Sequence, residues 1–351
     1  MTPNTKVLDN DKVIRLYRIL HRPVEIHNKM ANGREPEISC YPTLSTTLFA
    51  LISFYLDYFR DQGIPIREAR LVGGAASHVL CLEQRFTDFD VLFVVDPEKQ
   101  CGNLRQLFSR PLTAAEIFLK KLLWSDGEGR WPMNRRIMES TYISKKFLHL
   151  FPGSPDEWSL LTFHNMYGCN VELKFVRNMA REFEFATDSL QIDLAPMLKE
   201  FLNGREQVIV KSLFASVDLV EAHISQQRID TLKPSEIRGG GFLKFCLLKI
   251  KGFKEYRRGR ELHVMKREMV ETFLRDFDGK LSVISARHPV IMYMKVHLPR
   301  ESEEMKMKFI NQVQLVVKET YESHESQAAD NVLINMMDLA ADSVMLDKLL
   351  R

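Results

Sequence analysis

Two aspartates stand at the head of an apolar run, DFDVLFVV, at residues 88–95. Side chains alternate between the faces of a strand, so Asp88 and Asp90 point to the same side, roughly 6 to 7 Å apart. At an effective dielectric constant of about 20 the two carboxylates repel by about 2.5 kcal/mol, and burial adds a desolvation cost. A divalent cation offsets both costs, and Mg²⁺ prefers one or two carboxylates together with phosphate oxygens.

A glycine pair lies 15 residues before the first of these aspartates. Gly73 and Gly74 lack side chains, so the backbone can approach a ligand closely. The following AASHVL predicts the start of a helix whose first amides face an anion. A phosphate site and a metal site separated by one helix would place Mg²⁺ against a nucleoside triphosphate. This ordered combination favours nucleotide chemistry over aspartates that merely end an exposed strand, which is the simpler explanation of the D-x-D alone.

Two-metal phosphoryl transfer needs a further carboxylate that faces the aspartate pair. In NVELKFV, at residues 170–176, Glu172 lies between apolar neighbours and shares a strand face with Lys174. An ordinary Glu–Lys pair on a solvated strand face is the simpler explanation of this segment taken alone. Glu184 and Asp188 are the competing candidates for the third carboxylate.

Hydrophobic periodicity predicts the elements that must position these residues. Helices are expected at 10–21, 43–61, 75–82 and 113–124, and strands at 69–72, 88–95, 169–176 and 182–192. From about residue 194 onward helical periods dominate. The predicted fold class is an α/β N-terminal domain (a mixed sheet with helices), residues 1–192, followed by an all-helical C-terminal domain, residues 193–351.

The overall composition is that of a globular protein, and it names no partner. The 351 residues carry 49 Lys and Arg against 46 Asp and Glu, a net charge of +3. Five scattered cysteines favour free thiols in a reducing compartment over disulfides or a zinc site. The first residues contain no apolar signal segment, and the longest apolar run, 48–56, is too short to cross a bilayer. We expect a location in the cytoplasm and also the nucleus, without membrane insertion.

A basic segment in the second half is the leading candidate for RNA binding. Residues 249–268 hold eight Lys and Arg against three Glu, interleaved with Phe253 and Tyr256. Cations for phosphates and aromatic rings for stacked bases are what single-stranded RNA requires, although a solvated helix face explains most such runs. The residues expected to contact RNA are Lys254, Arg257, Arg258 and Arg260. The loop RWPMNRR, at 130–136, is a second candidate for a backbone contact.

A second glycine cluster comes before a predicted helix in SEIRGGGFLKFCLLKI, residues 235–250. The amides of Gly239, Gly240 and Gly241 are therefore a further candidate phosphate contact. Lys244 is the one charge within FLKFCLL. A tight turn between helices, with a lysine that extends to solvent, is the alternative.

Several of these segments together resemble one protein family. The order of GGAASHVL and TDFDVLF resembles the polymerase-β-like nucleotidyltransferases, and the longer string is similar to the terminal nucleotidyltransferase family five poly(A) polymerases. NVELKFV, EFEFATDSLQI and EIRGGGFLKFC, at 170–176, 182–192 and 236–246, resemble the same family in the same order. The similarity covers roughly residues 10–320.

The resemblance implies a template-independent RNA nucleotidyltransferase that adds AMP from ATP to RNA 3′ ends, a poly(A) polymerase acting in mRNA stabilisation. It implies that Asp88 and Asp90 are catalytic and bridge two Mg²⁺ or Mn²⁺ ions, and it favours Glu172 as the third ligand. The expected partners are ATP, the RNA 3′ end and proteins that direct the enzyme to its RNAs. The first domain would be the nucleotidyltransferase catalytic domain.

The resemblance also implies a nucleotide site with one departure from the family. Gly73, Gly74, Ser77 and Lys244 are the expected nucleotide-binding residues, with Lys244 as the helical-domain lysine that contacts the triphosphate. The family usually has Gly-Ser in the loop, where the serine hydroxyl contacts the triphosphate. Here the second position is Gly74, so the loop lacks that hydroxyl and reduced activity is expected.

Two alternatives remain open at this point. A catalytically weakened or inactive pseudoenzyme could serve as a binding scaffold in an RNA-regulatory or signalling complex, which Gly74 favours and the three retained acids disfavour. A synthetase of small molecules or oligonucleotides from the same superfamily would need no RNA primer, and the basic segment at 249–268 disfavours it.

Overall fold

The computed structural model describes residues 4–29, 40–96, 104–124, 132–150, 156–180, 182–199, 207–237, 239–277, 287–298 and 301–320. The chain divides into two compact units, Met1–Phe183 with Thr187–Ser225 and Glu184–Ala186 with Gln226–Arg351. The predicted fold class, a mixed sheet with helices followed by helices, is confirmed. The first unit continues through residue 225, past the boundary at 192 that the sequence led us to expect.

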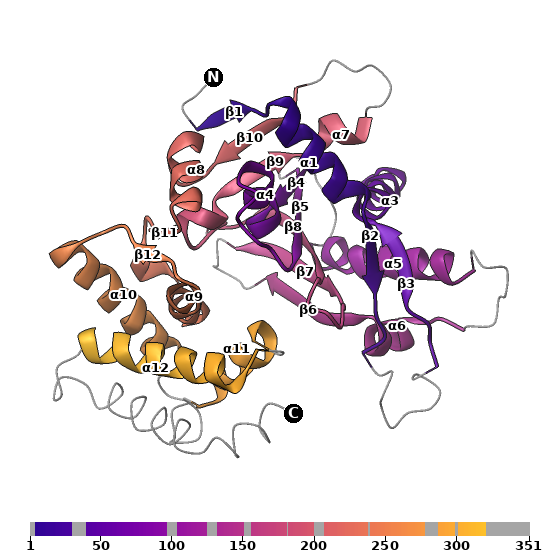
Figure 1. The fold of residues 1–351 in the computed structure, drawn as a ribbon. Coiled ribbons are helices and arrows are strands. Elements are labelled where there is room, and N and C mark those ends of the chain that lie inside the picture. The colour runs from indigo at the N-terminus through magenta and orange to yellow at the C-terminus, as the bar shows by residue number, and fades with distance from the viewer. Residues whose placement is uncertain are drawn as a thin grey trace. The chain divides into compact units, whose positions relative to one another are not determined.

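An eight-stranded mixed sheet forms the centre of the first unit (Figure 1). In sheet order its strands are β1 (Thr5–Val7), β10 (Ile209–Ser212), β9 (Leu190–Asp193), β4 (Ile66–Val72), β5 (Phe89–Val95), β8 (Val171–Asn178), β7 (Glu157–Phe163) and β6 (Ile143–Leu150). β5 and β8 pair in parallel, whereas the other neighbours are antiparallel. The strands expected at 69–72, 88–95 and 169–176 are the three central ones, β4, β5 and β8.

Some of the sequence-based boundaries differ from the structure, two of them for identifiable reasons. The helix expected at 43–61 begins at Leu48, because β3 (Leu44–Thr47) pairs with β2 (Pro23–Ile26) and Thr47 caps the helix. The strand expected at 182–192 is reduced to β9, because residues 184–186 belong to the second unit. Strands β6 and β7 were not expected at all.

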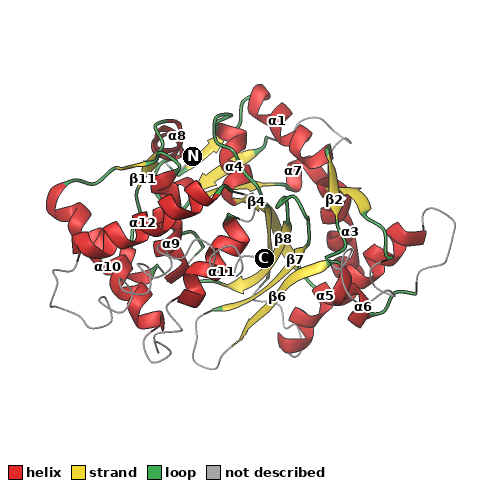
Figure 2. Ribbon diagram, turned by 60° about the horizontal axis from the view of Figure 1, so that its bottom comes forward, coloured by secondary structure: helices red, strands yellow, loops and turns green. Residues whose placement is uncertain are grey.

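Helices cover the core side of this sheet. They are α1 (Asn10–His21), α3 (Leu48–Asp61), α4 (Gly73–Leu80), α5 (Leu104–Trp124), α6 (Arg135–Thr141), α7 (Ala195–Lys199) and α8 (Val217–Ser225) (Figure 2). Buried Tyr55 of α3 packs against Phe93 and Phe175, whose stacked rings have centroids 4.9 Å apart. Because strand side chains alternate, residues 90 and 172 point to the opposite face, away from this aromatic layer.

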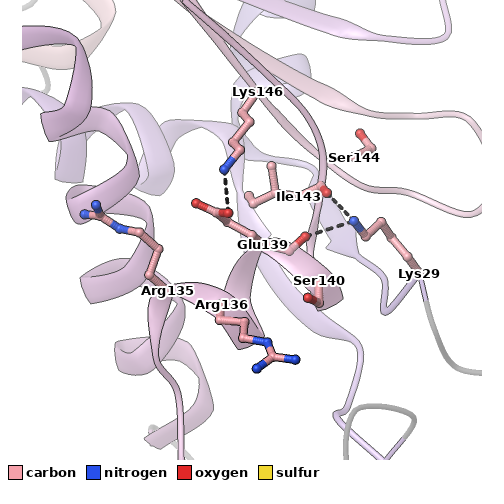
Figure 3. A pocket seen from close by; sticks show the side chains of 8 residues that line it. All are labelled: Lys29, Arg135, Arg136, Glu139, Ser140, Ile143, Ser144 and Lys146. Atoms are coloured by element: carbon pink, nitrogen blue, oxygen red, sulfur yellow. Dashed lines mark hydrogen bonds and ion pairs between the residues drawn. The ribbon is translucent and has the colours of Figure 1, made fainter. Parts of the chain in front are cut away.

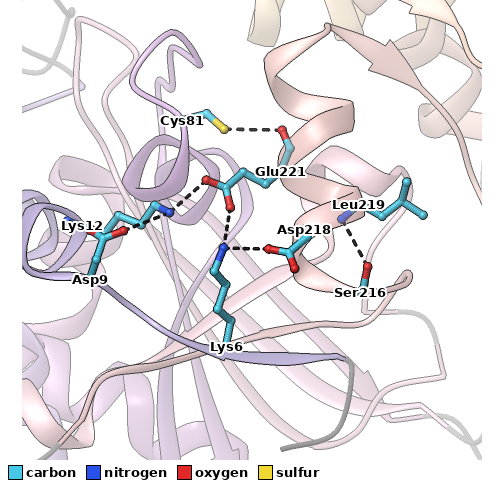
Figure 4. Close-up of polar contacts among 8 residues, drawn as sticks. All are labelled: Lys6, Asp9, Lys12, Cys81, Ser216, Asp218, Leu219 and Glu221. Carbon is cyan, nitrogen blue, oxygen red and sulfur yellow. Dashed lines mark hydrogen bonds and ion pairs between the residues drawn. The ribbon is translucent and has the colours of Figure 1, made fainter.

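Ion pairs join the N-terminal segment to α8 and explain why the first unit extends to residue 225 (Figure 4). The Lys6 ammonium lies 2.7 Å from an Asp218 carboxylate oxygen and 3.3 Å from one of Glu221. Lys12, which is mostly buried, reaches the other oxygen of Glu221 at 2.9 Å. β10 also pairs with both β1 and β9, so residues 209–225 complete the sheet and its cover.

The second unit is helical, apart from one short strand pair. Its elements are α9 (Gly239–Ile250), α10 (Gly259–Phe277), α11 (Arg287–His297), α12 (Glu303–Thr320), β11 (Arg228–Ile229), β12 (Lys254–Glu255) and two 3₁₀ turns, Ala186–Asp188 (shared with the first unit) and Pro234–Glu236. Phe242, Phe273 and Phe309 are fully buried in its own hydrophobic core. The tail after residue 320 lies outside the described residues.

Two general expectations can be compared with these units. Cys40, Cys81, Cys169 and Cys246 are free thiols, and Cys101 falls outside the described residues. Within the described ranges, no helix has both the length and the apolar composition needed to cross a membrane.

Candidate active site

The pairing of β5 with β8 brings two of the three expected carboxylates side by side. The parallel register places Asp90 opposite Glu172, and the antiparallel register with β4 places Val72 on the other side of Asp90. Neighbouring strands lie about 4.8 Å apart, so these carboxylates share one face within reach of one cation. The competing Glu184 lies in the second unit, and Asp188 ends a short 3₁₀ turn.

Asp88 lies one residue before β5 and is held by Asn170, which precedes β8. The backbone and side-chain amides of Asn170 donate to one Asp88 carboxylate oxygen at 3.3 and 3.2 Å. Burial raises the pKa of Asp88 from 3.8 to about 6, and the charges of Asp90 and Glu172 add to that rise. Burial is the larger cause, and the two neighbouring carboxylates add to it, which is the arrangement expected of a site that receives positive charge.

This raised pKa predicts how stability depends on pH. The folded chain holds the Asp88 proton more tightly than the unfolded chain, so the unfolding free energy falls as pH rises from about 4 to about 6. Asp88→Asn keeps an oxygen that accepts from Asn170 but removes the charge. We expect it to raise the unfolding free energy by about 2–3 kcal/mol at pH 7.5, with a much smaller gain at pH 4.

Urea unfolding of both proteins at the two pH values measures this difference without added divalent cations. A gain of equal size at pH 4 and pH 7.5 would contradict the assignment, because it would show that the substitution acts through packing and not through the charge.

Two lysines neutralise part of this acidic face. The Lys174 ammonium lies 2.7 Å from an Asp90 carboxylate oxygen and 3.9 Å from one of Glu172. Lys145 of β6 reaches Glu172 at 3.3 Å. The side chains of Asp90 and Glu172 are only 18% and 14% exposed, so these lysines supply counter-charge in a partly desolvated place.

The glycine loop lies directly against the carboxylates. Gly73 has φ +67°, a left-handed conformation that favours glycine, and a Cβ there would lie 2.7 Å from an Asp90 carboxylate oxygen. Helix α4 begins at this residue after Val72, which offers no side-chain cap. The first amides of a helix lack partners within the helix, so they can bind the oxygens of a phosphate beside Asp90.

The structure gives Gly74 and Ser77 different surroundings. A Cβ at Gly74 would lie 3.1 Å from the Cβ of Phe86, so a serine at this position requires a small shift of the loop before β5. Ser77 is fully buried, and its hydroxyl donates to the backbone carbonyl of Thr187. The expectation that Ser77 contacts the triphosphate does not fit this burial, so Ser77 is left out of the nucleotide site proposed below.

The carboxylates of this site are of the kind that Mg²⁺ prefers as ligands. Across the described ranges, no three His, Cys, Asp or Glu side chains form a ready-made metal cluster. Mg²⁺ in nucleotide enzymes is held by one or two carboxylates together with substrate phosphates, not by an all-protein cage. Asp90 and Glu172 would supply the carboxylates for such an ion, and the start of α4 would supply the phosphate position.

The second unit holds the other expected nucleotide-binding residue. Lys244 of α9 lies 3.6 Å from a Glu184 carboxylate oxygen and 5.9 Å from the centre of the Phe185 ring. Gly241 lies in the first turn of α9, and a Cβ there would clash with a methyl carbon of Ile237. Close packing therefore accounts for Gly241, and the contact of Lys244 with the triphosphate stays a prediction.

The basic segment divides into exposed and structural residues. Lys254, Arg258 and Arg260 are exposed. Arg257 instead pairs with Asp230 at 2.8 Å and donates to the Thr231 carbonyl, so it ties the segment to its own unit.

The aromatic residues of the segment divide in the same way. Phe253 is buried, which excludes it as a stacking surface, whereas Tyr256 is 45% exposed beside the Arg228 guanidinium. Arg130 and Trp131 of the second candidate loop lie outside the described residues.

Sequence reasoning missed three features that complete the site. The first is the hydrogen bond that Asn170 donates to Asp88, and the second is the ion pair of Lys174 with Asp90. The third is the ion pair with Glu172 made by Lys145, which comes from an unexpected strand. Lys174 was recognised only as a neighbour of Glu172 on one strand. Its contact with Asp90 depends on the register between two strands about 80 residues apart in the chain. A local sequence pattern does not contain that register.

Comparison with known proteins places this arrangement in a family. A family model described as nucleotidyltransferase matches residues 8–336. This chain belongs to that nucleotidyltransferase family. Human terminal nucleotidyltransferase 5B is 31% identical over 82% of this chain and 65% of the relative, and human terminal nucleotidyltransferase 5D is 32% identical over 76% and 67%. Terminal nucleotidyltransferase 5C of Gallus gallus is 29% identical over 90% and 77%.

These matches confirm the resemblance to the terminal nucleotidyltransferase 5 proteins that the sequence motifs indicated. The nucleotidyltransferase chain described here spans about two thirds of the length of the first two of these relatives.

Proposed function

We propose that this nucleotidyltransferase adds adenylates from ATP to the 3′ end of RNA, without a template. The observation that carries the proposal is the single row of Val72, Asp90 and Glu172 across β4, β5 and β8, with Gly73 and the uncapped start of α4 beside it. These residues support the proposal because they would put a cation next to a phosphate at the start of α4. The choice of ATP and of RNA rests on the family to which the chain belongs.

Asp88, Asp90 and Glu172 would hold the divalent ions, Mg²⁺ or Mn²⁺. Such ions supply charge for the triphosphate and lower the pKa of the attacking 3′-hydroxyl. The carboxylates would fix the position of that charge, and a cation there would relieve the repulsion of Asp88 by Asp90 and Glu172. Amides at the start of α4 bind phosphate oxygens. The 3′-hydroxyl loses its proton to solvent, and its oxygen then forms a bond to the α-phosphorus as the bond from that phosphorus to the leaving pyrophosphate breaks.

Two observations support a second candidate, a scaffold of low activity. The loop lacks the serine hydroxyl at Gly74, and Phe86 occupies part of the space that a serine would need. The Lys174 ammonium also lies on Asp90, where it competes with a divalent ion. The retention of three interacting carboxylates disfavours this candidate, because a site without function gains nothing from their mutual repulsion.

Competition by Lys174 gives a prediction for metal affinity. Lys174→Met removes the ammonium from Asp90, and we expect Mn²⁺ to bind the nucleotide-free protein at least ~10-fold more tightly by isothermal titration calorimetry. Lys120→Met is the matched control, since Lys120 also lies 2.7 Å from a carboxylate, that of Glu116. Tighter binding in the control as well, or weaker binding in Lys174→Met, would show that Lys174 does not compete for the metal position.

The proposed nucleotide preference is tested by primer extension. A 5′-labelled oligo(A) RNA is incubated with the full chain, Mg²⁺ or Mn²⁺ and each of the four nucleoside triphosphates separately. We expect initial rates with ATP at least ~10-fold above those with UTP, GTP or CTP. Faster extension with UTP would overturn the adenylate assignment while leaving nucleotidyl transfer in place.

A further inference from the structure

A basic cavity lies beside the edge strand β6 of the first unit (Figure 3). It measures about 780 Å³, and four of its lining side chains are cationic: Lys29, Arg135, Arg136 and Lys146. They come from three separate parts of the chain, namely the segment after β2, the start of α6 and the middle of β6. Figure 3 shows them arranged around the single acidic side chain, Glu139.

The charges of this cavity do not balance. Glu139 is paired with Lys146 at 2.6 Å, which leaves three lining cations in excess. Lys29 donates to the backbone carbonyls of Glu139 and Ile143, and partial burial lowers its pKa. These neutral carbonyls hold the ammonium in place without cancelling its charge. Arg135 and Arg136 are exposed, so an anion from the solvent can reach their guanidinium groups.

Strand β6 connects this cavity to the carboxylate row. Consecutive strand residues point to opposite faces, and here Lys145 reaches Glu172 whereas Lys146 reaches Glu139 in the cavity. β6 is the last strand of the sheet, so only one strand edge separates the two faces. A flexible chain that leaves the carboxylate row crosses β7 and β6 and reaches the cations beyond this edge.

The same edge carries exposed aromatic surface. Phe147 is 45% exposed, and its ring centre lies 5.2 Å from that of Trp158 on β7. Phe147 lies two residues after Lys145, on the side of the sheet that carries Glu172. Exposed rings beside lysines give unpaired bases a surface on which to stack. A lipid surface or a phosphorylated peptide would use the cations but has no need of these rings.

We propose that this cavity binds backbone phosphates of single-stranded RNA upstream of its 3′ end, with a base stacked on Phe147. The inference rests on the proposed function, because that function places the 3′ end at Asp90 and Glu172. The RNA runs from the carboxylate row across the β6 edge into the cavity. The site differs from the basic segment at 249–268, which belongs to the second unit.

The test measures binding of a 5′-fluorescein-labelled 16-nucleotide oligo(A) by anisotropy, between 50 and 200 mM salt. We expect Arg136→Glu/Lys146→Glu to weaken binding at least ~10-fold at 50 mM salt and to reduce the slope of log K against log salt by about 1.4, since each lost single-strand phosphate contact removes about 0.7. Phe147→Ala should weaken binding by a few-fold without changing the slope.

Arg60→Glu/Arg67→Glu is the matched control, because both side chains are exposed, by 74% and 65%, and the net charge changes equally. We expect this control to retain the wild-type slope. An equal loss in the control would show a general charge effect and would overturn the cavity as an RNA site. Undiminished RNA binding by the cavity variant would also overturn it.

Primer extension by the same proteins separates this inference from the proposed function. Extension by the wild type together with unchanged RNA affinity of the cavity variant refutes the cavity alone. RNA binding that is lost in the cavity variant, without extension by any protein, supports the cavity and refutes the transferase. If the wild type binds anionic vesicles or a phosphopeptide through these residues but not RNA, the cavity serves another polyanion and the inference fails.

Discussion

Glu172→Gln is expected to lower the rate of RNA extension by about 10²–10³-fold, because it removes a charged metal ligand while preserving size. A loss of 3–4 kcal/mol in transition-state stabilisation corresponds to this range. Initial rates at saturating ATP and primer measure the loss. The β5–β8 register is the reason for choosing this residue, since it sets Glu172 opposite Asp90.

The matched control is Glu184→Gln, which alters the competing carboxylate. Glu184 lies 3.6 Å from Lys244 and is not part of the β5–β8 pairing, so its loss should change the rate by less than about 10-fold. If the control loses as much activity as Glu172→Gln, the strand register does not identify which glutamate is the third metal ligand. If Glu172→Gln retains activity while the control loses it, Glu184 takes the role instead.

Gly73→Ala should have the second large effect, because it disturbs both the backbone and Asp90. An alanine at φ +67° costs about 1–2 kcal/mol of stability. Its Cβ would also lie 2.7 Å from an Asp90 carboxylate oxygen, so that carboxylate must move. A displacement of about 1 Å in a catalytic group can cost about 10²-fold in rate, and we expect a loss of that size in primer extension.

Gly63→Ala separates these two causes. Gly63 has φ +66° and nothing within 4 Å of the added Cβ, so it has the backbone cost without the contact. Both variants should lower the urea midpoint by similar amounts, whereas only Gly73→Ala should lose activity. Equal activity in the two variants would show that the approach of Gly73 to Asp90 is unimportant for catalysis.

The central strands were predictable because each carries a strong local signal. FDVLFVV forms β5 as an almost continuous apolar run, and VELKFV alternates as β8 does in the structure. The helix expected at 75–82 after the glycine pair is α4, although it begins two residues earlier, at Gly73, and ends at Leu80. Since the carboxylates lie within these segments, the core of the candidate site was visible before any register was known.

Other features depended on contacts between distant parts of the chain. ISKKFLHL, which forms β6, is an edge strand with five consecutive exposed residues, so it lacks the alternation that indicates a half-buried strand. The burial of Ser77 and Phe253 follows from how their elements pack, because the sequence places a residue on a helix or loop but does not set the side that faces the core. Arg257 was expected at a surface, but its partners Asp230 and Thr231 come from another segment.

The most direct test of the central claim is a primer-extension gel of the wild type, Asp88→Ala/Asp90→Ala and Gly74→Ser, with ATP and either Mg²⁺ or Mn²⁺. The account predicts a ladder with the wild type, none with the double variant, and a faster ladder with Gly74→Ser if the loop before β5 yields at Phe86. The absence of a ladder from both the wild type and Gly74→Ser, with either metal, would contradict it. A ladder from Gly74→Ser alone would show a site disabled at the phosphate loop, and the scaffold would become the better account.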